Sequence, residues 1–342
     1  MRIPLLIIIL FGYTGLVAQY VSLSGIINHY AAVTGMDSCL ARLDISDTTG
    51  FRAGGAAMLI QMQGATISAA NNSGFGNVAA LNAAGRFERV LIDSVAAGAL
   101  FLRNTWLYPY ELAGQVQVLS FPEFQHAIVT DTVRARPWDG STGGVIAFSV
   151  RDTLVLNAPV LADGAGFRGG AGFVAAVNNC TWLLGEASYF YEPGNWRGSF
   201  KGEGIAAVLP DKPFGRGAQA NGGGGGNDHN AGGGGGANAG AGGSGGENDE
   251  PSTFGCDGYF PGAGGRALAP DATRLFAGGG GGAGHANNNL TSSGGIGGGI
   301  IVLQAGVITG SNPLFSANGL PGGAAGGDGG GGGGGGGTVW LD

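Results

Sequence analysis

Long glycine runs in the C-terminal half constrain the fold of this chain more than any other feature. Two of the four runs, Gly222–Gly226 and Gly278–Gly282, are each followed by a histidine, His229 or His285, seven positions after the first glycine of the run. Such tracts form either flexible linkers or extended backbone segments packed against one another. The runs are Gly222–Gly226, Gly232–Gly236, Gly278–Gly282 and Gly329–Gly337.

The cost of ordering glycine favours the linker unless close packing offsets it. Fixing one backbone residue costs about 1–2 kcal/mol, and glycine loses more freedom than any other residue. Ordering the whole of Gly329–Gly337 therefore costs about 10–18 kcal/mol. Backbone hydrogen bonds between closely packed extended segments can offset this cost, because chains without Cβ atoms approach closely. Apolar, strand-like segments separate the runs, which favours the ordered alternative.

A repeated pattern surrounds the glycine runs. Two glycines followed by four apolar residues begin one copy at Gly143 and a second at Gly298. In both copies a closing glycine, Gly164 or Gly319, stands twenty residues after the second glycine of the pair. A third copy begins at Gly336. The matched spacing predicts a repeated supersecondary unit, although a duplication without present structural meaning would leave the same pattern.

These patterns predict an all-β protein. We expect residues 19–140 to form a small β-barrel or sandwich, and residues 141–342 to form a repeat β scaffold with packed polyglycine segments. Two insertions, residues 171–214 and 247–266, interrupt the second part. The expected strands, chosen from apolar and β-branched content, are Ala57–Met62, Glu88–Val95, Ala99–Leu102, Gln115–Leu119, Ala127–Val133 and Leu154–Leu161.

The N-terminus has the pattern of a secretory signal peptide over residues 1–18. Arg2 supplies the positive end, Pro4–Val17 is a short apolar stretch, and Ala18 suits cleavage. This stretch is shorter than a typical membrane span, and no later segment is long and apolar enough to be one. The sequence therefore predicts an exported protein, located outside the cell or at its surface.

Charge and motif content argue against nucleic-acid binding and against catalysis. The formal net charge is −7, and no cluster of Lys and Arg exists that could meet phosphates. The sequence contains no Gly-x-Ser-x-Gly elbow, no His-Glu-x-x-His and no phosphate-binding loop. We therefore expect no enzyme activity, with a polysaccharide-active enzyme as the remaining alternative, because paired carboxylates leave no local motif.

Two sets of residues are candidates for binding a metal ion. His229 and His285 occupy equivalent positions after their glycine runs, so stacking of the repeats could bring two imidazoles together. The competing and preferred interpretation is that both histidines cap glycine strands by hydrogen bonding to free backbone groups. A weak calcium site, with a solvated acidic loop as its alternative, is suggested by Glu247, Asp249, Glu250 and Asp257.

The two insertions carry the remaining candidates. Trp182, Tyr191 and Trp196 could contact a ligand, because aromatic side chains bring large apolar area to a binding surface. The alternative is that they form a small core that covers the edges of the glycine layer. Cys180 and Cys256 lie in different insertions, and export would permit a disulfide between them.

Several strings taken together resemble the glycine-rich N-terminal region of large secreted surface proteins, which the type IX system exports and which end in a type B sorting domain. The resemblance covers nearly all of residues 20–342. The chain departs from the family at Gly55, where an Asp is expected after Gly54. The strings are Phe51-x-x-Gly54, Met58–Met62-x-Gly64, Trp138-Asp139-Gly140, Gly164-x-Gly166-Phe167-Arg168-Gly169-Gly170, Lys201–Gly204, Asn221–Asn230 and Gly278–His285.

The resemblance implies a surface-exposed, non-catalytic module associated with gliding and adhesion, and it brings no catalytic residues with it. No sorting domain is present, so we expect a fragment of a longer protein. A more distant likeness is to glycine-rich phage tail adhesins, which pack polyglycine helices and present variable loops. The expected partners are a cell-surface glycan, a surface protein or a second copy of the chain, with no cofactor.

Overall fold

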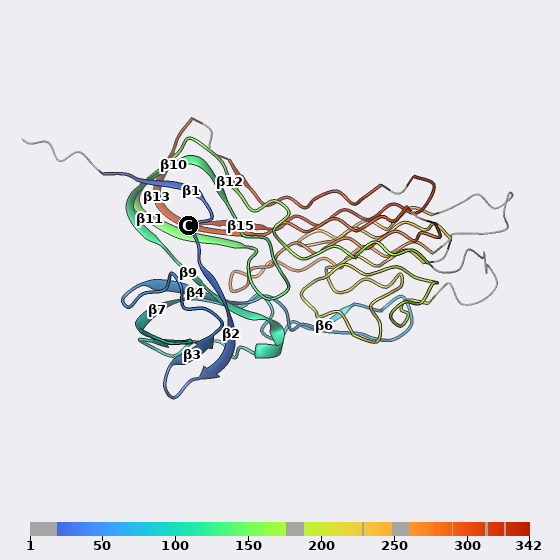
Figure 1. Cartoon of the computed structure of the whole chain (residues 1–342), viewed down its shortest axis with the longest axis horizontal. Helices are drawn as coiled ribbons and strands as arrows, with labels where there is room; N and C mark the ends of the chain where they lie inside the picture. The colour runs from blue at the N-terminus through green and yellow to red at the C-terminus, as the bar shows by residue number, and fades with distance from the viewer. Residues whose placement is uncertain are drawn as a thin grey trace, which may run out of the picture.

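A computed structural model describes residues 19–175, 188–227, 229–247, 260–288, 290–311, 314–324 and 326–342. Within these residues the regular structure is β-strand apart from one short 3-10 turn, Leu112–Gly114, so the predicted all-β class is confirmed. Three parts are visible in Figure 1: a small barrel, a parallel sheet above it, and long glycine segments that extend to one side of the sheet.

The barrel closes from antiparallel strands in the order β2, β3, β8, β7, β4 and β9. Strand β4 of the barrel is buried along its whole length. Alternate residues explain this burial: Ala57 and Leu59 point into the barrel core, whereas Met58 and Ile60 join the core between the barrel and the sheet. The strand bounds are β2 Tyr30–Asp37, β3 Arg42–Ile45, β4 Ala56–Gln61, β7 Phe87–Ala96, β8 Ala99–Leu102 and β9 Val116–Ser120.

The second sheet is parallel throughout, with strand order β14, β12, β10, β11, β13 and β15, and with β1 also paired to β10. Its central strands are apolar on both faces at their beginnings, as expected for a parallel sheet covered on both sides. The bounds are β1 Val21–Gly25, β10 Glu123–Arg134, β11 Val145–Leu156, β12 Val160–Leu161, β13 Ile300–Thr309, β14 Phe315–Ser316 and β15 Thr338–Leu341.

The sequence repeats lie side by side in this sheet. Val145 of the first copy pairs with Ile300 of the second, and Ile300 pairs with Thr338 of the third. Later in the same copies, Val160 pairs with Phe315. The two partners of this pair are separated along the chain by the same number of residues as Val145 and Ile300. The predicted repeat is therefore confirmed as a structural unit, because each copy places its strands parallel to the equivalent strands of the copy before it.

One expected strand is wrong in its bounds. Leu154–Leu161 is not one strand, because β11 runs without a break from Val145 to Leu156 and accommodates a bulge between Val150 and Thr153. The chain then leaves the ladder, and only the two residues of β12 pair again. Pro159 accounts for the interruption, since proline has no amide to donate to a ladder. The five expected strands before it correspond to β4, β7, β8, β9 and β10.

The glycine segments pack as a bundle, here called the glycine stack. At its centre lies the strand 278–285, whose amides donate in three directions in turn. Gly278, Gly281 and Gly284 donate to one neighbouring segment. Between each successive pair of these glycines lie two further amides, which donate to two other neighbouring segments, one each. This period of three is that of the extended polyglycine helix. The three accepting segments are 292–298, 231–237 and 200–203.

The carbonyl groups of the same strand accept hydrogen bonds in three further directions. Gly280 accepts from Gly223, Gly281 accepts from Gly170, and Gly282 accepts from Gly332. The central strand therefore has six hydrogen-bonded neighbours, and its glycines are buried without any side chain. The hydrogen bonds supply the compensation that the ordering cost requires. The three donating segments are 167–170, 223–226 and 329–335.

A hairpin of β5 (Thr66–Ile67) and β6 (Val78–Ala80) connects the barrel with the stack and lies beside the stack in Figure 1. Arg266 from the stack donates to the carbonyls of Ser73 and Phe75 in this hairpin. The predicted domain boundary at residue 140 stays a prediction. The sheets themselves cross it, because β1 and β10 precede residue 140 and belong to the parallel sheet.

Candidate functional site

The candidate site lies at the far end of the glycine stack, where strands turn back. We call this region the distal end and define it by Trp196, His229, Asn230, His285 and Asp328. His285 directly follows the central strand and is only 2% exposed. Its amide donates to Ala231 and its carbonyl accepts from Gly329, so the backbone continues the stack to its last turn.

The ring of His285 bonds to backbone on both sides. Its Nε2 lies 2.7 Å from the carbonyl oxygen of Trp196, and its Nδ1 lies 3.4 Å from the amide nitrogen of Asn230. A neutral ring with its proton on Nε2 satisfies both contacts, because Nε2–H then donates and Nδ1 accepts. His285 thus has the geometry of the strand cap that the sequence analysis preferred.

Asp328 links the two histidines electrostatically. Burial raises the pKa of its carboxyl, and hydrogen bonding from the Asn287 backbone together with the imidazoles of His285 and His229 opposes the shift. The Asn288 side-chain amide also donates to Asp328 over 3.3 Å. Both histidines therefore lie within electrostatic range of one carboxylate, at the same end of the molecule. No trio of His, Cys, Asp or Glu suited to a metal ion occurs among the described residues, and the metal site stays a prediction.

The aromatic candidates of the first insertion have different surroundings. Tyr191 is 8% exposed, and its backbone bridges to Phe214, whose ring centre lies 4.2 Å from that of Phe200. Tyr191 thus belongs to a small aromatic core, whereas Trp196 is half-buried at the distal end. The guanidinium of Arg197 lies 4.7 Å from the centre of the Trp196 ring. This pair offers an aromatic face and a cation together.

Several candidates lie outside the described residues. Trp182, Cys180 and Cys256 are among them, so the ligand contact of Trp182 and the disulfide stay predictions. Of the acidic residues proposed for calcium, the described part of the chain includes Glu247, which is exposed.

Lys201 has a structural role that the sequence did not indicate. Its side chain is 3% exposed, and Nζ donates to the carbonyls of Tyr189, Gly215 and Gly217 over 2.7–2.8 Å. The ammonium also lies 4.6 Å from the ring centre of Phe75. Burial lowers the pKa of Lys201 well below its usual value. The scarcity of lysine was the available signal, since Lys201 and Lys212 are the two lysines of the chain.

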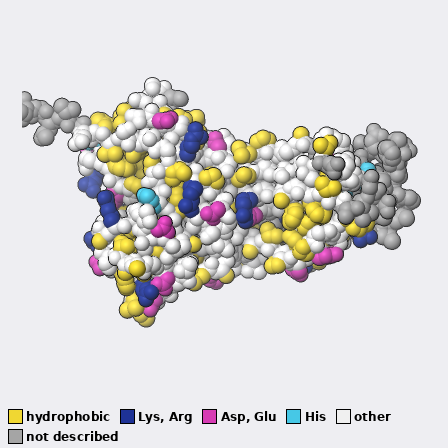
Figure 2. Space-filling view, in the orientation of Figure 1, with side chains coloured by type: hydrophobic (Ala, Val, Ile, Leu, Met, Phe, Trp, Pro, Cys, Tyr) yellow, Lys and Arg dark blue, Asp and Glu magenta, His cyan; other side chains and the backbone are white. Residues whose placement is uncertain are grey.

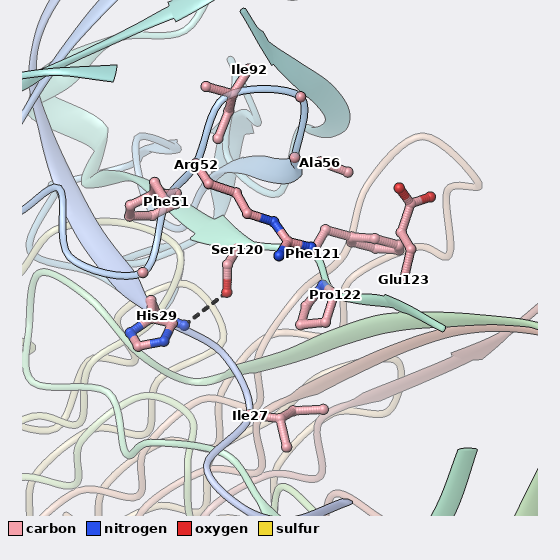
Figure 3. Close-up of a pocket in the computed structure, with 13 residues that line it drawn as sticks. Ile27, His29, Phe51, Arg52, Ala56, Ile92, Ser120, Phe121, Pro122 and Glu123 are labelled. Carbon is pink, nitrogen blue, oxygen red and sulfur yellow. Dashed lines mark hydrogen bonds between the residues drawn. The ribbon is translucent and has the colours of Figure 1, made fainter. Parts of the chain in front are cut away.

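A separate pocket of about 270 Å³ lies between the barrel and the parallel sheet. In Figure 3 the side chain of Arg52 reaches toward Phe121, and the hydroxyl of Ser120 faces His29. Ser120 accepts a hydrogen bond from the backbone amide of His29 over 2.9 Å. Glu123 is the one carboxylate that lines this pocket, and it pairs with Arg89 outside it. The lining residues therefore do not supply two facing carboxylates of the glycosidase type.

The visible face of the molecule is unevenly charged. In Figure 2 charged side chains gather over the barrel and sheet, whereas uncharged atoms cover much of the glycine stack.

In the described part of the chain, no helix has the length and apolar character needed to span a bilayer.

Comparisons with known proteins identify no family for this chain. No protein-family model matches it, and no curated protein matches it. Among solved structures it is similar to the Gp54 tailspike of Acinetobacter baumannii bacteriophage AP22, solved in complex with A. baumannii capsular saccharide. The identity is 11% and the TM-score 0.20, over 42% of this chain and 26% of the tailspike. The match spans about a quarter of the tailspike's length.

Proposed function

We propose that this chain is a secreted, non-catalytic module of a cell surface, which holds adhesive contact loops at the end of a stiff glycine scaffold. The observation that supports this most is the six-neighbour packing of the strand 278–285. A bundle whose interior amides are bonded in every direction resists bending and local opening. Such a scaffold projects its distal end away from the barrel and sheet (Figure 1).

The partner that we propose is a cell-surface glycan, bound beside Trp196. A half-buried indole can stack on the apolar face of a sugar ring, and polar groups beside it can hydrogen bond to the hydroxyls. Arg197 lies against the indole, and Asn195 is held next to it by Glu192 over 2.8 Å. Aromatic, cationic and amide groups therefore meet on one short segment at the end of the scaffold.

A glycan array tests this proposal. Trp196→Ala should reduce glycan binding by about tenfold, since a stacked aromatic contact contributes roughly 0.5–1.5 kcal/mol beyond the apolar area that it buries. Trp106→Ala is the matched control, because Trp106 is a half-buried indole on the barrel, away from the distal end. It should leave glycan binding unchanged. Binding that survives Trp196→Ala, or that both variants lose equally, would contradict the proposed contact.

A further inference from the structure

A groove lined almost entirely by backbone runs along one side of the glycine stack. It has a volume of about 770 Å³. Its floor consists of Gly232, Gly233, Gly235 and Gly236, and residues 241–247 and 329–334 form its two walls. We call it the glycine groove.

The floor strand 231–237 has five neighbours where the central strand has six. Among the described residues its carbonyls are satisfied in two directions: Ala231, Gly234 and Ala237 accept from the central strand, and Gly232 and Gly235 accept from the segment 262–265. The third set of carbonyls consists of Gly233 and Gly236. Neither accepts a hydrogen bond from any backbone amide in the described ranges.

The walls present the complementary groups. In the wall 329–334, Gly331 and Gly332 donate to other strands, but the amides of Gly330 and Gly333 have no backbone acceptor within the described chain. Gly330 and Gly333 are exposed. The opposite wall repeats the pattern at Gly243 and Gly246, whose amides likewise donate to no described carbonyl. The groove thus combines acceptors on its floor with donors on its walls, both spaced three residues apart.

Two side chains mark one end of the groove. Asn230 Oδ1 and Asp328 Oδ2 are buried atoms of lining residues, and neither accepts a hydrogen bond from the residues that the structure describes. They provide further acceptors beyond the carbonyls of the floor.

We propose that the glycine groove binds one further extended, glycine-rich strand, supplied by another polypeptide. Its amides would donate to Gly233 and Gly236, and its carbonyls would accept from the amides of the two walls. These are the directions in which every interior strand of the stack already bonds. The proposal depends on the geometry of the groove alone and does not rest on glycan binding at the distal end.

The stack also predicts the sequence of the bound strand. A Cβ atom added to Gly280, Gly281 or Gly282 would collide with one of the three neighbours that donate to the central strand. A strand in the groove has two such neighbours, the walls, and its third direction is solvent. Two positions in three must therefore be glycine, and the third can carry a side chain. The wall 241–247 follows this Gly-Gly-X rule, with Ser244 and Glu247 exposed.

The test uses the full chain and a fluorescent (Gly-Gly-Ser)₄ peptide, followed by fluorescence anisotropy. We expect saturable binding of one peptide per chain. A (Gly-Ala-Ser)₄ peptide should bind at least about tenfold more weakly, because its methyl groups would meet a wall. Absence of saturable binding to (Gly-Gly-Ser)₄, or equal binding of both peptides, would overturn the proposal.

Two substitutions locate the peptide. A Cβ at Gly235 would lie 3.5 Å from Gly243 and 3.6 Å from Gly333, between the walls, so Gly235→Leu should block the groove. Gly327→Leu is the matched control, because its Cβ meets no atom within 4 Å and it lies outside the groove. Gly243→Leu, also open at Cβ and on the wall, replaces Gly235→Leu if thermal melting shows that variant to be unfolded. Unchanged binding by a folded blocking variant would contradict the assignment.

Discussion

At the scale of single residues, glycine is required in the stack because of what surrounds each Cα, rather than for backbone flexibility. An added Cβ at Gly280 would collide with the carbonyl of Arg168, whereas an added Cβ at Gly327 would meet nothing within 4 Å. The two glycines carry no positive φ, so ordinary backbone conformations hold at both. Crowding by neighbouring backbone is therefore the difference between them.

This contrast gives a stability prediction. Gly280→Ala should destabilise the fold by about 3 kcal/mol or more, at the upper end of overpacking costs, because the obstacle is hydrogen-bonded backbone that cannot move aside. Gly327→Ala should change the free energy of unfolding by less than about 1 kcal/mol, or raise it slightly by restricting the unfolded chain. Urea denaturation measures both. Equal free energies of unfolding for the two variants would mean that the stack is not packed as described.

At the scale of elements, the place of a glycine segment in the stack decides which of its amides are hydrogen-bonded: the interior strand 278–284 is bonded at every amide, whereas a segment at the edge leaves every third amide unbonded. In the nine-glycine run the amides of Gly331, Gly332, Gly334 and Gly335 donate to neighbouring strands. Those of Gly330, Gly333 and Gly336 donate to no backbone carbonyl in the described ranges and belong to exposed residues. Such a segment is ordered by its hydrogen-bonded neighbours, because glycine itself favours no single backbone conformation.

Amide hydrogen exchange followed by NMR should therefore show a period of three along residues 329–337. Gly332 and Gly335, which donate into the stack, should exchange slowly, and Gly330 and Gly333 should exchange fast. The interior strand 278–284 is the internal control and should be protected at every amide. Uniformly fast exchange through both segments would restore the flexible-linker interpretation.

At the scale of the whole molecule, Tyr30 joins the barrel to the parallel sheet. Its hydroxyl, on the first residue of β2, donates to the carbonyl of Val145 at the start of β11 over 2.6 Å. Burial raises the pKa of Tyr30 from 10.0 to about 12, and the Arg136 backbone and charge oppose this shift. The neutral phenol is thus the form that the folded junction favours.

A pH prediction follows with a definite sign. Because the folded pKa is raised, the contribution of Tyr30 is fully present below pH 10 and is lost as pH rises from about 10 to about 12. The wild-type free energy of unfolding should fall across this window by roughly 2–3 kcal/mol more than that of Tyr30→Phe. Denaturation curves between pH 8 and pH 12 compare the two. Parallel pH dependence would exclude Tyr30 as the titrating group, while other buried tyrosines affect both proteins alike.

The sequence determined by itself the all-β class, five strands of the N-terminal half and the repeat, because apolar alternation and a matched spacing are local or directly countable. It also favoured ordered glycine over linker. Tertiary structure alone decided that the central strand has six neighbours, that β1 and β10 join the parallel sheet, and that Lys201 is buried beneath three carbonyls. Identical glycines give no register of their own, so which strand lies beside which depends on contacts between residues far apart in the chain.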